Sequence, residues 1–215
     1  MNYALYGIDK LHFGIELGTE MKLSSRFSIN GSVALGRYYY DSRQNATISA
    51  DNDAYILERA IVYTKNFRIA GTPQEAYNLG LSFQSGSLYT SFSVNYFRQN
   101  WLSINPLRRT YGALPDVIPG SDLWTKLIYQ TQLPDQLTTD FSAGTSTKLK
   151  WFGGKQKQTF MINVSINNLL NKQDMMASGY EQLRFDVEEK NVNKFPPKYF
   201  YAMGFNFSIN LSLQF

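Results

Sequence analysis

The sequence predicts an all-β protein: an antiparallel transmembrane β-barrel segment of about seven strands, belonging to a larger barrel. Three observations favour this fold. Several stretches alternate between apolar and polar residues, short and long connections follow one another in turn, and aromatic residues gather near the ends of the alternating stretches. Outer-membrane barrels have this organisation, because each strand separates lipid from a polar lumen and the periplasmic turns are short.

The composition excludes several classes of protein. No run approaches the roughly 18 apolar residues of a spanning helix, so the chain is not a helical membrane protein. Its 21 Lys and Arg residues are scattered, which argues against a nucleic-acid partner. There is no Cys, and His12 is the only His, so a Ser-His-Asp or Cys-His centre lacks its parts. We therefore predict no enzymatic activity, no metal and no cofactor.

The first two strands are expected at about 11–23 and 27–40. In the first, apolar residues from Leu11 to Met21 occupy most odd positions, and polar or small residues occupy the even ones. Residues 1–10 lack the basic start and apolar core of a signal peptide. Because a barrel protein must be exported, we expect that a signal has been removed or that residues precede Met1.

The remaining strands are expected at 77–84, from Leu88 to near Trp101, and at 137–151, 160–166 and 199–215. The last alternates most regularly: every odd position is apolar and every even position is small or polar, apart from Phe200. Short turns at 24–26, 85–87 and 152–155 alternate with long polar connections at 41–76, 102–136 and 171–197. Residues 60–69 contain β-formers but alternate poorly, and assigning them to a long connection preserves this rhythm.

Seven strands leave the sheet incomplete. Lipid does not tolerate an open backbone edge, and the smallest single-chain bacterial barrels have eight strands. The strand at 199–215 would pair with a first strand that this chain does not contain. We therefore expect the 215 residues to be the C-terminal portion of a larger barrel, with the C-terminus in the periplasm. The residues expected in the two interfacial girdles are Tyr38, Tyr39, Tyr40, Trp101, Trp151, Phe152, Tyr199 and Tyr201.

Four segments resemble the C-terminal end of TonB-dependent outer-membrane receptors, in particular the SusC-like glycan importers of Bacteroidota. They are Gly71-Thr72-Pro73-Gln74, Asn105-Pro106-Leu107-Arg108-Arg109-Thr110, Ile166-Asn167-Asn168-Leu169-Leu170-Asn171, and the terminal strand with its final Leu213-Gln214-Phe215. The resemblance covers nearly the whole chain. It implies a 22-stranded barrel in the outer membrane of a Gram-negative cell, with an N-terminal plug.

The resemblance also implies partners and a function. The parent protein would import a nutrient such as an oligosaccharide, energised by the TonB complex, beneath a SusD-like surface lipoprotein. The barrel-assembly machinery would read the terminal strand as its membrane-assembly signal, through Phe207, Ile209, Leu211, Leu213 and Phe215. The chain contains no plug and no earlier strands, so alone it is not expected to transport. A split or truncated barrel piece with a structural role remains the alternative.

Side chains in two regions are candidates for contacts. In the outer connections, aromatic and basic residues could contact a sugar or the lipoprotein, although we favour loop packing for each of them: Arg108, Arg109, Tyr111, Trp124 and Tyr129. The inward charged residues either pair with the plug or simply hydrate the lumen, and we favour hydration for His12, Glu16, Glu20, Lys22, Asp140, Lys148 and Lys150. Asp51-Asn52-Asp53 lacks the other ligands of a calcium loop, so we expect a solvated loop there.

Overall fold

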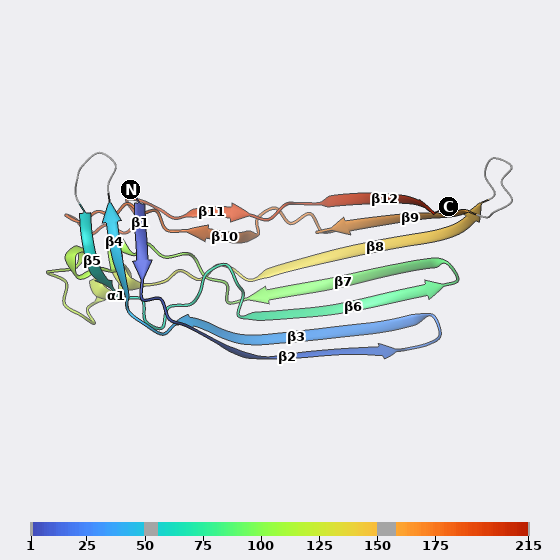
Figure 1. The fold of residues 1–215 in the computed structure, drawn as a ribbon, viewed down its shortest axis with the longest axis horizontal. Helices are drawn as coiled ribbons and strands as arrows, with labels where there is room; N and C mark the ends of the chain where they lie inside the picture. The colour runs from blue at the N-terminus through green and yellow to red at the C-terminus, as the bar shows by residue number, and fades with distance from the viewer. Residues whose placement is uncertain (1, 50–55, 150–157, 215) are drawn as a thin grey trace.

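The fold is a single-layer antiparallel sheet with its long connections gathered at one end. The computed structural model describes residues 2–49, 56–149 and 158–214. Seven strands lie side by side in the order β12-β9-β8-β7-β6-β3-β2 (Figure 1). Their bounds are β2 (Lys10–Lys22), β3 (Phe27–Tyr40), β6 (Glu75–Ser85), β7 (Leu88–Arg98), β8 (Gln136–Leu149), β9 (Gln158–Asn167) and β12 (Asn206–Gln214).

These strands fall where the alternation predicted them, and consecutive members of the set are neighbours in the sheet. All six pairings are antiparallel. The poorly alternating segment at 60–69 lies outside this sheet, as its assignment to a connection predicted. The all-β antiparallel prediction is therefore confirmed, whereas closure into a barrel is not observed in the described sheet.

The strand register separates the side chains into two faces. The apolar face consists of the odd positions of β2, β3, β6, β8 and β12 and the even positions of β7 and β9. One row of this face is apolar on all seven strands: Met21, Ile29, Leu81, Phe92, Phe141, Ile166 and Phe207. The adjacent row points to the other side, the polar face: Lys22, Ser28, Ser82, Ser91, Ser142, Ser165 and Ser208.

The two ends of the sheet differ. At the turn end, the Ser24 hydroxyl accepts hydrogen bonds from the backbone N–H groups of Arg26 and Phe27, and Gly86 supplies the positive φ of the β6–β7 turn. At the connection end, β1 (Asn2–Tyr6), β4 (Gln44–Ser49) and β5 (Ile56–Val62) form a three-stranded sheet, and β10 (Met176–Tyr180) pairs with β11 (Lys198–Tyr201) (Figure 1).

The connection at 102–136 contains short helices that the sequence analysis did not predict. They are η1 (Leu107–Arg109), η2 (Tyr111–Ala113) and α1 (Asp122–Ile128). Ser121 caps α1, because its hydroxyl accepts from the N–H of Trp124 at 3.2 Å. In the part of the chain that the structure describes, no helix has the length and apolar character needed to cross a membrane.

The hydrophobic core lies in the connections and not against the large sheet. Two clusters form it: one joins Ala113, Leu114, Val117 and Leu127, and the other joins Ala46, Ile48 and Val62. Among the described residues, none of the fully buried apolar side chains belongs to the seven strands. A soluble sheet would place its core against one of its faces, so this sheet needs another explanation for its apolar face.

The terminal strand is shorter than predicted, because residues 202–205 interrupt it. The Asn171 side chain accepts from the N–H of Phe205 at 2.9 Å, and Asn168 Nδ2 donates to the carbonyl of Met203 at 3.0 Å. The N–H of Ala202 donates to the carbonyl of Met175. These bonds to residues 168–175 replace the strand ladder. The continuous strand expected at 199–215 is therefore wrong, and β11 and β12 are separate elements.

Candidate functional site

The apolar face of the sheet is uncovered in this chain. Leu17 is 68% exposed and Leu211 is 62% exposed, although both belong to long strands. Six strand spacings of about 4.8 Å give a width of roughly 29 Å, and the six residue steps from Tyr77 to Phe83 add about 20 Å of length. The resulting area of roughly 600 Å² is already at the upper end of apolar patches on soluble monomers. An exposed apolar patch of this size marks a surface that interacts with another protein, a ligand or a membrane.

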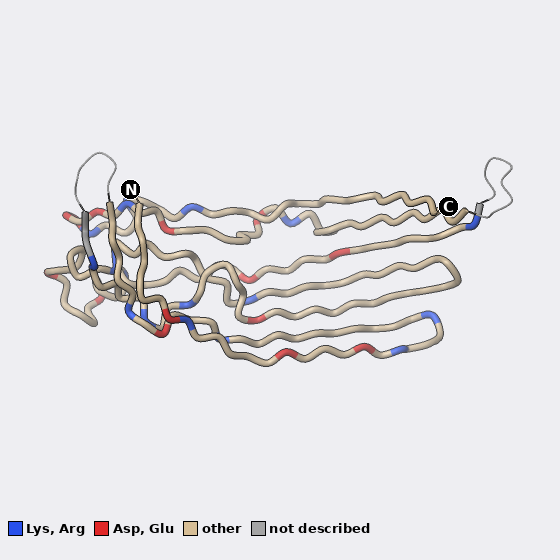
Figure 2. Tube along the Cα trace, viewed as in Figure 1, with Lys and Arg blue, Asp and Glu red and all other residues tan. Residues whose placement is uncertain are grey.

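A charged network limits the apolar face at the connection end. Arg37 Nη1 donates to Gln99 Oε1 at 2.9 Å, and Gln99 Nε2 donates to Glu75 Oε1 at 2.5 Å. Arg98 then bridges Glu75 at 3.3 Å and Asp135 at 3.1 Å. Beyond the network, the charged residues gather among the connections, whereas few lie on the central strands (Figure 2).

Tyrosines lie between the charged network and the apolar rows. The hydroxyl of Tyr77 donates to Glu75 at 3.1 Å and that of Tyr96 donates to Asp135 at 2.7 Å, while their rings pack 6.1 Å apart on the apolar face. A polar tip on an apolar body suits the boundary between lipid and water. β6 and β7 each contain 11 residues, which matches the roughly 9–11 residues of a transmembrane β-strand.

The girdle residues predicted from the sequence take different positions. Tyr39 lies on the apolar face, where its ring meets Phe13 edge-on at 6.4 Å. Tyr38 and Tyr40 occupy the alternate positions and therefore lie on the polar face, because three consecutive residues of a strand cannot share one side. All three lie at the connection end of β3, but only Tyr39 lies on the apolar face, and a place in an interfacial girdle stays a prediction.

The other predicted girdle residues lie beyond the ends of the seven strands or outside the described part. Trp101 follows β7 and forms a bridge with Gln132. Tyr199 and Tyr201 belong to β11, which pairs with β10 and not with the large sheet. Trp151 and Phe152 lie outside the described residues.

A ladder of hydrogen bonds crosses the polar face. Asn30 Nδ2 donates to Asn78 at 3.2 Å, Asn78 donates to Asn95 at 2.7 Å, and Asn95 donates to Asp140 at 2.8 Å. Asp140 also accepts from the N–H of Asn168 at 3.0 Å. Amide side chains can donate and accept at once, so they continue such a ladder from strand to strand. The central part of the polar face is thus joined by side-chain hydrogen bonds across four strands.

The charged residues predicted on the polar face have few partners there. Asp140 belongs to the amide ladder, and the ring of His12 packs 5.1 Å from that of Tyr38. Glu16, Glu20, Lys22 and Lys148 are exposed and form no ion pair among the described residues. Lys150 and Asp51-Asn52-Asp53 lie outside the described residues.

The sheet has two open edges within the described residues, because β2 and β12 each pair with a single strand. Four residues of the predicted membrane-assembly signal lie exposed on the apolar face of β12: Phe207, Ile209, Leu211 and Leu213. Phe215 lies outside the described residues. Because seven is odd, β2 and β12 run in the same direction. If another segment closed this sheet into a barrel with every pairing antiparallel, that segment would have to add an odd number of strands.

A buried ion pair joins the long connections. The guanidinium of Arg109 is fully buried and donates to both carboxylate oxygens of Glu181, at 2.5 and 2.9 Å. Arg109 also donates to the carbonyls of Asn105, Ile128 and Tyr129. Its backbone carbonyl accepts from the N–H of Tyr63, which ties residues 41–76 to the same cluster. We call these contacts the Arg109–Glu181 clasp.

Arg108 supplies a second positive charge to the clasp. Its Nη2 atom donates to Glu181 at 2.9 Å and to the carbonyl of Tyr129 at 3.1 Å. Burial, together with the neighbouring charge of Arg109, lowers the pKa of Arg108 to about 10, against the attraction of Glu181. Arg108 therefore stays charged at neutral pH. Two guanidinium groups share one carboxylate, and backbone carbonyls accept from further donors of both, whereas the buried Arg108 Nε has no hydrogen-bond partner among the described residues.

The five predicted ligand or lid contacts divide by exposure. Arg109 has no exposed surface, so its guanidinium serves the clasp, and Arg108 is largely buried beside it. Trp124 packs on the connection core and meets Tyr63 at 5.4 Å. Tyr111 is 67% exposed and Tyr129 is 57% exposed, so these two remain accessible to a partner. Ligand contact itself stays a prediction.

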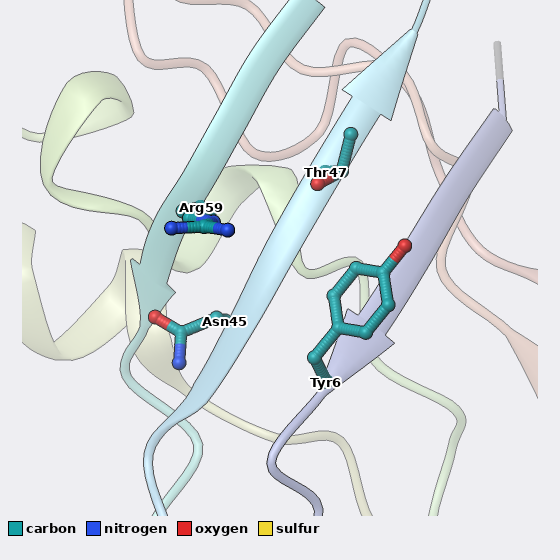
Figure 3. A pocket seen from close by; sticks show the side chains of 4 residues that line it. All are labelled: Tyr6, Asn45, Thr47 and Arg59. Carbon is teal, nitrogen blue, oxygen red and sulfur yellow. The ribbon is translucent and has the colours of Figure 1, made fainter.

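A hollow of about 740 Å³ lies on the small sheet and was not predicted. Tyr6, Asn45, Thr47 and Arg59 line it from β1, β4 and β5 (Figure 3). They present an aromatic ring, an amide, a hydroxyl and a guanidinium, which suit a hydroxyl-rich ligand. The alternation in Gln44–Ser49 could have predicted this strand and its outer face. Ala46 and Ile48 enter the core, whereas Asn45 and Thr47 lie on the opposite side and line the hollow.

A second ion pair orders the connection at 171–197. Asp186 is buried, and its carboxylate pairs with Lys194 Nζ at 3.1 Å. Burial raises the pKa of Asp186, but the Lys194 ammonium and the N–H groups of Glu189 and Asn191 outweigh it and leave the pKa below its usual value. The hydrogen bond to Asp186 raises the pKa of Lys194 in turn, against the effect of burial.

This pair predicts a pH-dependent stability of residues 185–195. The lowered pKa of Asp186 contributes stability above the usual aspartate value of 3.8, and this stability is lost as the pH falls through the folded-state pKa. The raised pKa of Lys194 contributes below 10.5 and is lost above it. Hydrogen exchange of these amides, corrected for intrinsic rates, should show protection that falls at both extremes. In Asp186→Asn, the protection should no longer depend on pH in the acid range. An unchanged loss of protection at low pH in this variant would show that the pair does not order this segment.

Comparison with known proteins adds no assignment. No family model, curated protein or solved structure matches this chain. Within the described residues, no three His, Asp or Glu side chains are grouped so that they could hold a metal ion. The geometry of the sheet and its connections is therefore the basis for a functional proposal.

Proposed function

We propose that the chain is the C-terminal barrel portion of an outer-membrane, TonB-dependent transporter of the SusC-like type, which imports an oligosaccharide or a similar glycan. The observation that carries the proposal is the uncovered, two-faced sheet of seven antiparallel strands. Its apolar face suits lipid, its polar face suits a wet lumen, and its strands have the length of barrel strands.

Two further features support transport over a purely structural barrel. The long connections all lie at one end, where exposed Tyr111 and Tyr129 and the hollow at Tyr6 offer rings and hydrogen-bonding groups for sugars. The amide ladder keeps the polar face hydrated along the path that a solute would take. A barrel piece with only a structural role is the second candidate, and the open edges of β2 and β12 favour it equally well.

An uptake experiment separates the two candidates. The coding segment is disrupted in its host, and accumulation of a panel of labelled oligosaccharides is measured with and without a protonophore. We expect loss of gradient-dependent accumulation of at least one member, restored by re-expression of the intact gene. Normal uptake of the whole panel, with the protein present in the outer membrane of the undisrupted host, would leave only the structural role.

A further inference from the structure

Two arginines flank Tyr39 on the apolar face at the connection end. Arg37 lies opposite Phe13 in the β2–β3 register and therefore points to the same side as Tyr39, two residues along. Arg68 forms a bridge with Tyr39, and its guanidinium carbon lies 5.8 Å from the centroid of the Tyr39 ring. Both side chains thus lie at the level where the apolar face ends.

Neither arginine has an acidic partner among the described residues. Arg98, on the same face, contacts both Glu75 and Asp135, so its charge is balanced. Arg37 is exposed, and within the described part of the chain its guanidinium donates to the neutral Gln99 alone, which leaves most of its five N–H donors without a described partner. Among the described residues, the guanidinium of Arg68 contacts the ring of Tyr39 and forms no ion pair. Two positive charges therefore remain uncompensated at one point of this boundary.

The backbone that carries Arg68 is held firmly. The buried Gln130 side chain accepts from the N–H of Arg68 at 2.7 Å and donates to its carbonyl at 2.7 Å. Arg68 also borders an open groove of about 330 Å³ with a largely apolar lining that includes Phe67, Trp101 and Tyr129. A fixed cation beside apolar surface matches an amphiphile with an anionic head.

We propose that Arg37 and Arg68 bind the phosphate group of an anionic lipid whose apolar part lies against Phe13 and Tyr39. Guanidinium groups bind phosphate through paired, charge-assisted hydrogen bonds. Aromatic residues such as Tyr39 lie at the headgroup level of membranes, which is the depth of a lipid phosphate. The inference rests on the proposed function, because it requires the apolar face to contact lipid.

The expected contribution of each arginine is moderate. A basic residue close to an anionic membrane surface strengthens binding roughly fivefold. Loss of both side-chain charges should therefore weaken lipid binding roughly 25-fold if the two act independently. Arg43 is the matched control, because it also stacks on a tyrosine, with its guanidinium carbon 5.5 Å from the Tyr63 ring, but lies in the connection after β3.

The test uses the assembled protein, purified from outer membranes together with whatever segment completes its sheet. It is placed in phosphatidylcholine nanodiscs that contain a small fraction of phosphatidic acid, and native mass spectrometry measures the retained phosphatidic acid. The Arg37→Gln/Arg68→Gln double variant should retain it roughly 25-fold more weakly, whereas Arg43→Gln should match the unaltered protein. Excess inorganic phosphate should displace little of it, because the lipid's apolar part contributes to binding.

Three results would overturn the inference. If the double variant retained as much phosphatidic acid as the unaltered protein, the two arginines would not form the binding site. If Arg43→Gln lost as much phosphatidic acid as the double variant, the effect would be one of net charge. Complete displacement by inorganic phosphate would indicate a site for the free anion. Recovery of every variant in the outer membrane keeps the proposed function separate, since a protein that never enters the membrane would instead contradict that function.

Discussion

Replacement of Glu181 by Gln should lower the free energy of local unfolding around the Arg109–Glu181 clasp by about 3–5 kcal/mol, because it leaves two buried guanidinium groups without a counter-charge. Arg109 is fully buried and Arg108 nearly so, and neither can turn to water without breaking bonds to the carbonyl of Tyr129. In Glu181→Gln, hydrogen exchange of the Arg109 and Thr110 amides should accelerate by roughly two to four powers of ten.

Glu188→Gln is the control for this result. Glu188 lies in the same connection and is exposed, so the same chemical change should cost less than about 0.5 kcal/mol. Equal exchange rates in the two variants would show that the clasp does not hold the connections together. Exchange in the central strands β6 and β7 should stay unchanged in both, because their contacts do not depend on the clasp.

An arginine at Leu81 should destabilise the assembled protein by about 2–4 kcal/mol, the cost of a cation on the lipid face near the middle of a barrel strand. Leu81 lies in the apolar row that crosses all seven strands and is 44% exposed. Ser82→Arg changes the next residue of the same strand, which belongs to the polar row. Unfolding by denaturant in lipid vesicles should show the penalty for Leu81→Arg and a small effect for Ser82→Arg. Equal penalties for the two variants would contradict the claim that lipid contacts the apolar face and water contacts the polar face.

Alternation predicted the large sheet well, because a period of two is a local property of the chain. It identified all seven strands and both faces, and the rhythm of connections correctly kept residues 60–69 out of the sheet. The local signal of β4 was present in Gln44–Ser49, but its polar composition favoured a loop. Ser121 before Asp122 likewise marked the start of α1 and was not used.

Other features could not be predicted, because they depend on contacts between distant residues. Arg109 and Glu181 are 72 positions apart, so the local sequence around either residue does not predict the clasp. The interruption at 202–205 arises from the side chains of Asn168 and Asn171, more than thirty residues earlier, although only Phe200 departs from the alternation in 199–215. The faces of Tyr38 and Tyr40, in contrast, followed from the same alternation and should have been assigned to the polar side.

The central claim is that lipid covers the apolar face, and spin-label accessibility along β6 tests it most directly. The chain has no Cys, so single cysteines can be introduced one at a time from Asn78 to Phe83 and labelled without background. In the assembled protein in vesicles, labels at Leu79, Leu81 and Phe83 should favour collisions with lipid-soluble oxygen. Labels at Asn78, Gly80 and Ser82 should favour a water-soluble nickel complex. A uniform preference for the water-soluble reagent at all six positions would contradict the account.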